Sequence, residues 1–385
     1  MKNIAVLGCT GSIGRQTLDI IRANPDKFRA AVLCAGRDAD AMLKAAEEFR
    51  PDYIAMADEA AADKLRQSGI KAKIAGGEQA VLEAAAYEGA DIIVNGISGF
   101  SGMKPLLAAL EAGKTVALAN KESIVCAHDL VNAALKKGGA IIPVDSEQSA
   151  IFQCMAAGNH GEIQRLILTA SGGPFREYTK EQLKTVTPEQ AGHHPTWKMG
   201  RKITIDSASF FNKGLEIMEA SYLFGIPGER ISVLVHPESI VHSMVEYTDG
   251  CNMAQLSRPD MRLAIQYALT YPERTPGEFG RLRLEDMGKI SFYAPDTDKF
   301  PAIPMAYEAL REGRNLPIVY KRQVYNGANE AAVDMFIRGK IRFDEIADVV
   351  GYAMSRADRG NILSLEDIIK TDRQARRLAF EKGNA

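Results

Sequence analysis

Apolar and polar positions alternate in blocks along residues 1–150. Short apolar runs are separated by stretches in which apolar residues recur at helical spacing, such as 41–49 and 104–112. The expected strands are 4–7, 30–34, 53–56, 91–95, 115–119 and 140–144. Strands that alternate with helices predict a parallel sheet covered by helices, the doubly wound α/β arrangement. Ligands of such sheets bind beyond the carboxyl ends of the strands, so polar residues at those ends are candidates for a site.

The pattern changes after residue 150. Strands are expected at 165–169, 231–235 and 243–247 with a helix at 212–224, and 272–300 has the Pro, Gly and charge typical of a linker. Helices are then expected at 302–312, 323–338, 343–355 and 364–382, the last starting after Ser364 with Asp367 as a capping-box partner. We therefore expect a Rossmann-type domain (1–148), an α+β domain (149–271), a linker (272–300) and a C-terminal helical bundle (301–385).

Composition narrows the class of protein. A chain of 385 residues is too long to fold around a single hydrophobic core, so more than one domain is expected. Its composition, with 46% hydrophobic and 25% charged residues, is typical of globular proteins. A formal charge of −2 argues against nucleic-acid binding, and no apolar run approaches the roughly 18 residues of a membrane span. The five cysteines are scattered without a C-x-x-C pair, and no signal or transit segment precedes the first strand. We expect a cytoplasmic protein with reduced thiols.

A glycine-rich loop follows the first strand. Its glycines, Gly8, Gly11 and Gly14, have the spacing G-x-x-G-x-x-G at the start of a helix, where backbone N–H groups can approach a pyrophosphate. The alternative is a turn without a ligand. At the end of the second strand, Arg37 favours the 2′-phosphate of NADP, whereas the adjacent Asp38 could bind the 2′-hydroxyl of NAD. The alternative is that both residues are solvated turn residues without a ligand. Of the two cofactors, NADP is the preferred interpretation.

Carboxylates and a lysine follow later strands. Lys121 follows the fifth expected strand and Asp145 follows the sixth, so both should lie at the same edge of the sheet. If the chain is extended from Asp145 to Glu147, these two side chains could point the same way. Converging carboxylates need a cation or a proton, and an all-oxygen set favours Mg²⁺ or Mn²⁺. A solvated turn is the alternative for Asp145 and Glu147 alone. Glu216 is the natural third carboxylate.

Hydroxyl, amide and ammonium donors gather in two later segments. Ser171 with its two following glycines ends one strand, and Ser207 precedes Asn212 and Lys213 at a helix start, which together suit a phosphate monoester. Ordinary loop chemistry would explain either segment alone. Trp197, the single tryptophan, lies in a loop rich in Pro and Gly. It is either a core residue or a lid that excludes water from a hydride transfer.

Several motifs in order resemble one family. They are Gly8-Cys9-Thr10-Gly11-Ser12-Ile13-Gly14, Leu118-Ala119-Asn120-Lys121-Glu122-Ser123, Pro143-Val144-Asp145-Ser146-Glu147, Ser171-Gly172-Gly173-Pro174-Phe175-Arg176, His194-Pro195-Thr196-Trp197-Lys198-Met199-Gly200, Asn212-Lys213-Gly214-Leu215-Glu216, Pro259-Asp260-Met261-Arg262 and Asn326-Gly327-Ala328-Asn329-Glu330. Together they resemble 1-deoxy-D-xylulose 5-phosphate reductoisomerases along nearly the whole chain. The resemblance implies an NADPH-binding first domain, a central catalytic and dimerisation domain, and a homodimer. It also implies conversion of a sugar phosphate to 2-C-methyl-D-erythritol 4-phosphate in the non-mevalonate isoprenoid pathway, without nucleic-acid or membrane partners.

The resemblance assigns roles by matching position. Lys121 and Glu147 would act in proton transfer and charge stabilisation. Asp145, Glu147 and Glu216 would bind Mg²⁺ or Mn²⁺, with Co²⁺ as a further candidate. The substrate would contact Ser146, Ser171, His194, Trp197, Ser207, Asn212 and Lys213, with Met199 and Met261 as covers over substrate and nicotinamide. NADPH would contact Thr10, Gly11, Ser12, Ile13, Gly36, Arg37, Asp38, Asn120, Glu122 and Gly200.

Two other functions would also use a nucleotide-binding first domain. An NADP-linked semialdehyde dehydrogenase would need a nucleophilic cysteine, and neither Cys126 nor Cys154 has an evident base in the sequence. A nucleotide-sensing regulatory protein would not need Lys121 together with the carboxylates. Both are weaker interpretations than the reductoisomerase.

Overall fold

The computed structural model describes residues 1–197, 199–311, 318–358 and 364–384. The chain divides into two units by its internal contacts. The first unit comprises Met1–Ser123, Asp129–Asp145 and Asp260–Gly280, and the second comprises Ile124–His128, Ser146–Pro259 and Arg281–Ala385. This division keeps the central and C-terminal parts together in the second unit. The limits of the functional domains, given above as 1–148, 149–271 and 301–385, stay a prediction.

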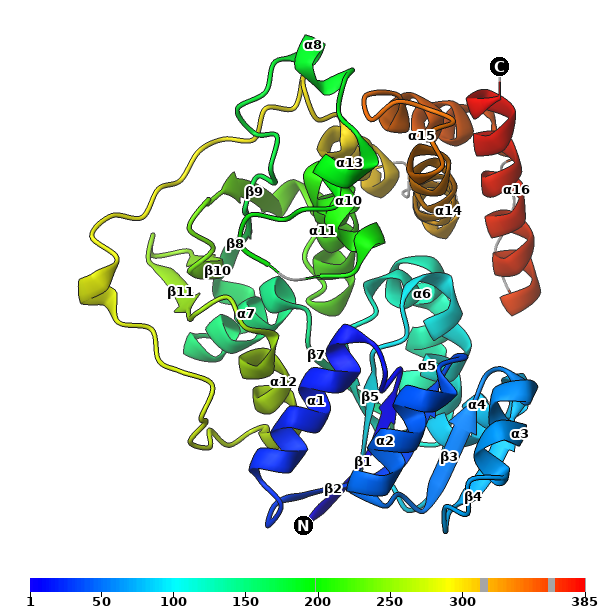
Figure 1. Ribbon diagram of the computed structural model, residues 1–385. Coiled ribbons are helices and arrows are strands. Elements are labelled where there is room, and N and C mark those ends of the chain that lie inside the picture. The colour runs from blue at the N-terminus through cyan, green and yellow to red at the C-terminus, as the bar shows by residue number, and fades with distance from the viewer. Residues whose placement is uncertain (198, 312–317, 359–363, 385) are drawn as a thin grey trace. The chain divides into compact units, whose positions relative to one another are not determined.

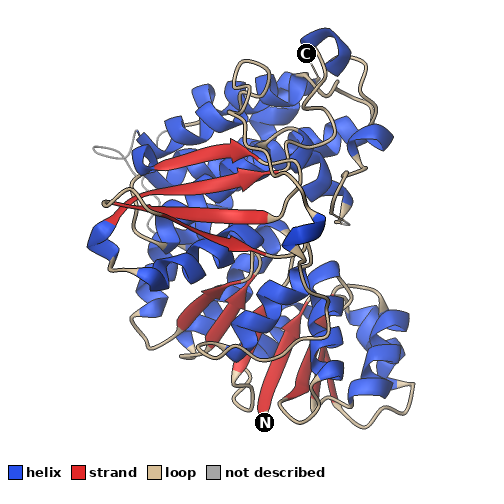
Figure 2. Cartoon of the chain, turned by 90° about the vertical axis from the view of Figure 1, so that its left-hand side faces the viewer, coloured by secondary structure: helices blue, strands red, loops and turns tan. Residues whose placement is uncertain are grey.

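Seven parallel strands form the sheet of the first unit, in the order β4-β3-β2-β1-β5-β6-β7. Figure 1 labels most of these strands, and Figure 2 shows the sheet with helices beside it. The strands are β1 (Lys2–Leu7), β2 (Phe28–Ala35), β3 (Tyr53–Met56), β4 (Lys73–Gly76), β5 (Ile92–Asn95), β6 (Thr115–Leu118) and β7 (Ala140–Pro143). This confirms the doubly wound arrangement. The strand order reverses between β1 and β5, which is where such sheets bind dinucleotides.

Helices connect these strands. They are α1 (Ser12–Ala23), α2 (Ala39–Phe49), α3 (Glu59–Arg66), α4 (Gly77–Ala85), α5 (Met103–Glu111) and α6 (Lys121–Leu135), and α12 (Met261–Thr270) joins the same unit from later in the chain. Helix α12 packs against α1, and Lys2 Nζ donates a hydrogen bond to the backbone oxygen of Leu269 at 3.0 Å. Helix α6 is interrupted at Ala127, whose φ and ψ are −126° and 24°.

A four-stranded mixed sheet lies in the second unit, in the order β11-β10-β8-β9. Its strands are β8 (Ile163–Ala170), β9 (Ile231–Val235), β10 (Val241–Tyr247) and β11 (Asn252–Leu256). Strands β8 and β9 are parallel, whereas β10 is antiparallel to both β8 and β11. Together with the helices of this unit, the sheet confirms the expected α+β class.

The helices of the second unit are α7 (Ser146–Cys154), α8 (Lys180–Leu183), α9 (Pro188–Ala191), α10 (Arg201–Ala208), α11 (Phe211–Leu223), α13 (Ala302–Arg311), α14 (Ile318–Ile337), α15 (Glu345–Arg356) and α16 (Leu365–Gly383). Helix α7 packs on β10 and β11, α11 packs on α13, and α14 packs on α15 and α16 (Figure 1). The capping box of Ser364 and Asp367 is present, as predicted. Residue 312 of the expected helix 302–312 lies outside the described residues. Among the helices that the structure describes, none is long and apolar enough to cross a membrane.

Candidate functional site

Three carboxylates meet where β7 is followed by α7. Asp145, Glu147 and Glu216 each offer one oxygen, and these oxygens lie within 4.8 Å of one another. Asp145 directly precedes α7, Glu147 is in the first turn of α7, and Glu216 is on α11. The expectation that residues 145–147 form an extended stretch is wrong, because α7 already begins at Ser146. The helix N-terminus carries a partial positive charge that favours a carboxylate at Glu147.

Two buried lysines neutralise part of this negative charge. Lys121 Nζ lies 2.5 Å from Asp145 Oδ2, and Lys213 Nζ lies 2.6 Å from Glu147 Oε1 and also contacts Glu216 Oε2. Burial alone would lower the pKa of Lys213, but the charges of Glu147 and Glu216 outweigh burial and raise it. Lys213 is therefore a charged ammonium in the protein.

The carboxylate cluster fits a hard divalent cation. All the donors in the group are carboxylate oxygens, and in the described parts of the chain no Cys or His joins them. Such a donor set suits Mg²⁺ or Mn²⁺ better than zinc. Glu216 is held in place by Asn212, whose Nδ2 donates to Glu216 Oε1 at 2.5 Å, and by Gln148, whose Nε2 donates to its backbone oxygen at 3.0 Å.

His194 is locked in one tautomer beside Ser171. Its Nδ1 accepts hydrogen bonds from the backbone N–H groups of Thr196 (3.1 Å) and Trp197 (2.9 Å), so the ring proton resides on Nε2. This Nε2 donates to Ser171 Oγ at 2.8 Å. Burial lowers the pKa of His194 to about 4, with the charge of Glu147 opposing the shift. His194 is therefore a neutral donor that positions the Ser171 hydroxyl.

Ser171 and Ser207 come from segments that pack directly on each other. Ser207 lies in the last turn of α10, and Gly173 packs on the end of that helix, where an added Cβ would lie 2.9 Å from the Cα of Ala208. Asn212 and Lys213 follow in the first turn of α11, after Phe210 in the left-handed region with a φ of 64°. The structure therefore brings the second sheet's Ser171 segment to the junction of α10 and α11.

Trp197 is half-buried in the loop before α10. Its ring centroid lies 5.9 Å from that of His242 on β10. Burial lowers the pKa of the buried His242, and the charge of Glu147 opposes this shift. His242 was not predicted from the sequence, because a single histidine beside an expected strand carries no motif. Lys198 of the same loop lies outside the described residues, whereas Met199 is partly exposed and Gly200 is the N-cap of α10.

The glycine-rich loop of the first unit has the predicted strand–loop–helix setting. Gly8 has a φ of 80°, and a Cβ there would lie 2.9 Å from the backbone oxygen of Gly96. At Gly14 a Cβ would lie 2.2 Å from the backbone oxygen of Gly8, so α1 packs tightly on the loop. Between these glycines, the residues predicted to contact NADPH are exposed or partly exposed, namely Thr10, Gly11, Ser12 and Ile13.

The second predicted cofactor segment follows β2. The side chain of Arg37 is 88% exposed, with its Nε 3.6 Å from Asp58 Oδ2, and Gly36 is also exposed. Asp38 caps α2, because its Oδ1 accepts a hydrogen bond from the backbone N–H of Ala41 at 2.9 Å. Arg37 is thus an accessible positive charge in this segment, and Asp38, which is also exposed, has a structural role whether or not it contacts a ribose.

Two further predicted residues flank the start of α6. Asn120 caps the helix by accepting from the backbone N–H of Ser123 at 3.0 Å, and its Nδ2 donates to Glu122 Oε2 at 3.1 Å. Ser146, at the start of α7, donates from its hydroxyl to Glu147 Oε2. The local contacts of Asn120, Glu122 and Ser146 therefore orient the residues around Lys121 and Glu147.

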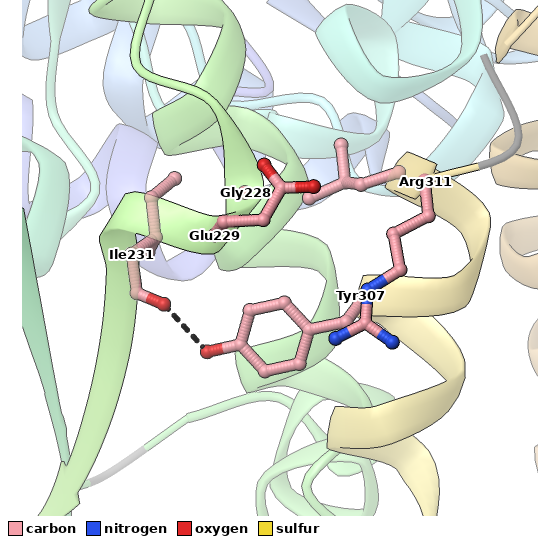
Figure 3. Close-up of a pocket in the computed structure, with 6 residues that line it drawn as sticks. Gly228, Glu229, Ile231, Tyr307 and Arg311 are labelled. Carbon is pink, nitrogen blue, oxygen red and sulfur yellow. Dashed lines mark hydrogen bonds between the residues drawn. The ribbon is translucent and has the colours of Figure 1, made fainter. Parts of the chain in front are cut away.

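A pocket elsewhere in the second unit is unrelated to these residues. It is lined by Gly228, Glu229, Ile231, Tyr307, Leu310 and Arg311. Figure 3 shows Tyr307 and Arg311 of α13 facing Glu229 and Ile231, and the Tyr307 hydroxyl donates to the backbone oxygen of Ile231 at 2.8 Å. None of the predicted site residues lines this pocket.

Comparison with known proteins covers nearly the whole chain. Models described as 1-deoxy-D-xylulose 5-phosphate reductoisomerase, its C-terminal domain and the DXP reductoisomerase C-terminal domain match residues 4–128, 141–224 and 256–378. A reductoisomerase of Chlorobaculum tepidum is 47% identical over 382 residues, covering 98% of this chain and 99% of the relative. One of Geobacillus sp. is 47% identical over 380 residues, covering 98% of each.

Solved structures agree with these sequence relatives. The reductoisomerase from Zymomonas mobilis in complex with NADPH superposes with a TM-score of 0.92 at 41% identity, covering 100% of this chain and 99% of that one. A DOX-P reductoisomerase in complex with NADPH, fosmidomycin and magnesium has a TM-score of 0.92 at 38% identity, covering 100% and 98%. The chain therefore belongs to the 1-deoxy-D-xylulose 5-phosphate reductoisomerase family.

Proposed function

We propose that the protein converts 1-deoxy-D-xylulose 5-phosphate to 2-C-methyl-D-erythritol 4-phosphate, using NADPH and a divalent cation. Membership of the family along nearly the full chain supports this reaction. Relatives solved with NADPH, fosmidomycin and magnesium support the cofactors. The observation that carries the proposal for this chain is the cluster of Asp145, Glu147 and Glu216 beside Lys213. The non-mevalonate isoprenoid pathway is the proposed context.

The proposed reaction has two stages. The carbon skeleton of the substrate is first rearranged, by retro-aldol cleavage and aldol re-addition, to an aldehyde of the same composition. The aldehyde carbon then accepts a hydride from NADPH while its oxygen accepts a proton, which gives the product and NADP⁺. Both stages develop negative charge on substrate oxygens, so the site needs positive charge close to them.

The three carboxylates are the proposed ligands of Mg²⁺ or Mn²⁺, with Co²⁺ as a further candidate. When bound, such an ion polarises substrate oxygens as a Lewis acid. Lys121, held 2.5 Å from Asp145, is proposed to stabilise charge and supply a proton from its ammonium group. Glu147 combines a proposed ligand role with proton transfer, and the hydroxyl of Ser146 beside it is a proposed substrate contact.

The phosphate of the substrate is proposed to bind Ser171, Ser207, Asn212 and Lys213. The neutral His194 orients the Ser171 hydroxyl, and the N-terminus of α11 adds backbone donors next to Asn212 and Lys213. Binding of a phosphate would draw the Lys213 ammonium toward a third anion in addition to Glu147 and Glu216. Trp197, Met199 and Met261 are proposed covers that exclude water.

NADPH is proposed to bind the first unit. The loop of Thr10, Gly11, Ser12 and Ile13 would hold the pyrophosphate at the start of α1, and Arg37 would hold the 2′-phosphate. Gly36, Asp38, Asn120, Glu122 and Gly200 stay predicted contacts. A semialdehyde dehydrogenase is disfavoured further, because Cys126 and Cys154 are both buried. A homodimer and a cytoplasmic location also stay predictions; light scattering of the purified protein would measure the oligomeric state.

The proposed function is tested by identifying the product. The protein is incubated with Mg²⁺, 1-deoxy-D-xylulose 5-phosphate and NADPH that carries deuterium at the transferred position, and the sugar phosphates are analysed by mass spectrometry. The expected result is 2-C-methyl-D-erythritol 4-phosphate that contains one deuterium from the cofactor. Recovery of unchanged substrate from folded protein that binds NADPH would reject the proposal.

A further inference from the structure

We propose that Asn329 is a positioning residue for phosphate binding, because it holds Asp206 and thereby the adjacent Ser207 in place. This inference rests on the proposed function of Ser207 as a phosphate ligand. The motif 326–330 is part of the family resemblance, but none of its residues belongs to the proposed metal, substrate or cofactor site. Asn329 lies on α14, far along the chain from the predicted substrate ligands.

The contact between the two helices is direct and buried. Asn329 Nδ2 donates to Asp206 Oδ1 at 2.8 Å, and neither residue is more than 1% exposed. The other carboxylate oxygen, Asp206 Oδ2, lies 2.8 Å from Lys202 Nζ on the same helix. The two oxygens of this buried carboxylate thus face different donors, and Asn329 is the one that comes from another helix.

The position of Asp206 matters because the phosphate segment is built around it. Ser207 is the next residue of α10, and Gly173 of the Ser171 segment packs on Ala208 one residue later. A shift of the last turn of α10 would therefore move two proposed phosphate ligands, Ser207 and Ser171, together. Loss of a hydrogen-bond donor to a buried carboxylate is unfavourable in free energy. Asp206 would therefore move, or bind a water molecule, to regain a donor.

Helix α14 also supports the second helix that carries phosphate ligands. Gly214 on α11 packs against Tyr325 on α14, where an added Cβ would lie 1.9 Å from the Tyr325 hydroxyl. That hydroxyl donates to the backbone oxygen of Ala302 at 3.1 Å. Tyr325 and Asn329 are four residues apart, so they lie on one face of α14. This face contacts α10 through Asp206 and α11 through Gly214.

The placement makes a specific kinetic prediction. Asn329→Ala removes the donor to Asp206 without altering a proposed substrate contact, so it should weaken phosphate binding more than it slows the chemical steps. We expect the KM for 1-deoxy-D-xylulose 5-phosphate and the Kd for inorganic phosphate to rise about tenfold, which corresponds to about 1.4 kcal/mol. The kcat should stay within about threefold, and the Kd for NADPH should not change, since loss of one hydrogen bond in α10 leaves the first unit intact.

Asn326→Ala is the matched control. Asn326 is equally buried on the same helix, and its side-chain amide has no hydrogen-bond partner among the residues that the structure describes. It should lower stability without raising the Kd for phosphate. A second test is the exchange Asp206→Asn with Asn329→Asp, which reverses donor and acceptor and leaves an amide oxygen for Lys202. The exchange should return the KM to within about threefold of the wild-type value, and it also serves if Asn329→Ala does not fold.

The outcomes separate the inference from the proposed function. If the wild-type protein turns over the substrate but folded Asn329→Ala has an unchanged KM and phosphate Kd, Asn329 does not position the phosphate site. The same conclusion follows if Asn326→Ala raises the phosphate Kd equally, or if the folded exchange variant keeps a tenfold higher KM. Absence of turnover by the wild-type protein would instead contradict the proposed function.

Discussion

The ammonium group of Lys213 lies 2.6 Å from Glu147 Oε1 and also contacts Glu216 Oε2. One buried cation is therefore shared by two of the three carboxylates that are proposed to bind the metal, and it offsets one of their two negative charges. Because Lys213 is also a proposed phosphate ligand, metal ion and phosphate both affect the same side chain. The ammonium would then compete with a metal ion for the carboxylates and would attract the phosphate of the substrate.

Lys213→Met separates these two effects. Removal of the charge should raise the KM for the substrate at least tenfold, since hydrogen bonds to charged groups are among the stronger ones. The same change should lower the Kd for Mn²⁺ about tenfold, because Glu147 and Glu216 lose a competing cation. Titration calorimetry with Mn²⁺ and steady-state kinetics measure the two values, with the exposed Lys180→Met as control. A weaker Mn²⁺ affinity in Lys213→Met would show that the ammonium does not compete with the ion.

Glu216→Gln tests the third carboxylate. Glutamine keeps the length of the side chain but replaces one anionic ligand oxygen with an amide nitrogen. We expect the Kd for Mn²⁺ to rise, and kcat to fall, by about 100-fold or more. Glu229→Gln is the control, because Glu229 is an exposed glutamate that lines the pocket in Figure 3. Near-normal turnover of Glu216→Gln with saturating Mn²⁺ would remove Glu216 from the metal site.

His194 should stay neutral well below its ordinary pKa of about 6.5. Its pKa in the folded protein is about 4, because the ring is buried. Between these values the unfolded chain binds a proton that the folded protein does not. The stability that neutral His194 contributes is therefore complete above about pH 6.5 and is lost as the pH falls toward 4. An NMR titration, with the resonance assigned by its loss in His194→Gln, should give a midpoint near 4; a midpoint near 6.5 would contradict the locked tautomer.

Arg37 should determine the preference between the two nicotinamide cofactors. Arg37→Ala is expected to raise the KM for NADPH about tenfold and to leave the KM for NADH unchanged, since only NADPH carries the 2′-phosphate. Asp38→Asn is the companion variant, because asparagine also caps a helix well and α2 should remain intact. An equal rise of the KM for NADPH and for NADH in Arg37→Ala would show that Arg37 does not bind the 2′-phosphate.

The interior strands could be predicted from the sequence because they are buried on both faces. Strand β3 was predicted with the limits that it has in the structure, Tyr53–Met56, and its four residues are all buried. The edge strands β4 and β11 were not predicted, because they are not buried on both faces. Their residues are mostly exposed or half-buried, so they lack the apolar run or the alternation that marks a strand.

The site could be predicted only as a set of residues. Spacing and resemblance identified Asp145, Glu147 and Glu216, which the structure brings together. The ion pair of Lys213 with Glu147 depends on how α7 and α11 pack, and the contact between Asn329 and Asp206 joins residues 123 positions apart. No local pattern encodes such a distance, because it follows from the tertiary packing of helices that are separate in the chain.

The central claim is that the three carboxylates hold the ion required for substrate-dependent oxidation of NADPH. Its most direct test is to strip the protein with EDTA, add 1-deoxy-D-xylulose 5-phosphate and NADPH, and follow NADPH absorbance during titration with Mn²⁺ or Mg²⁺. We predict no oxidation before the ion is added and saturable oxidation afterwards. Oxidation that continues without the ion, or none in its presence from folded protein that binds NADPH, would contradict the claim.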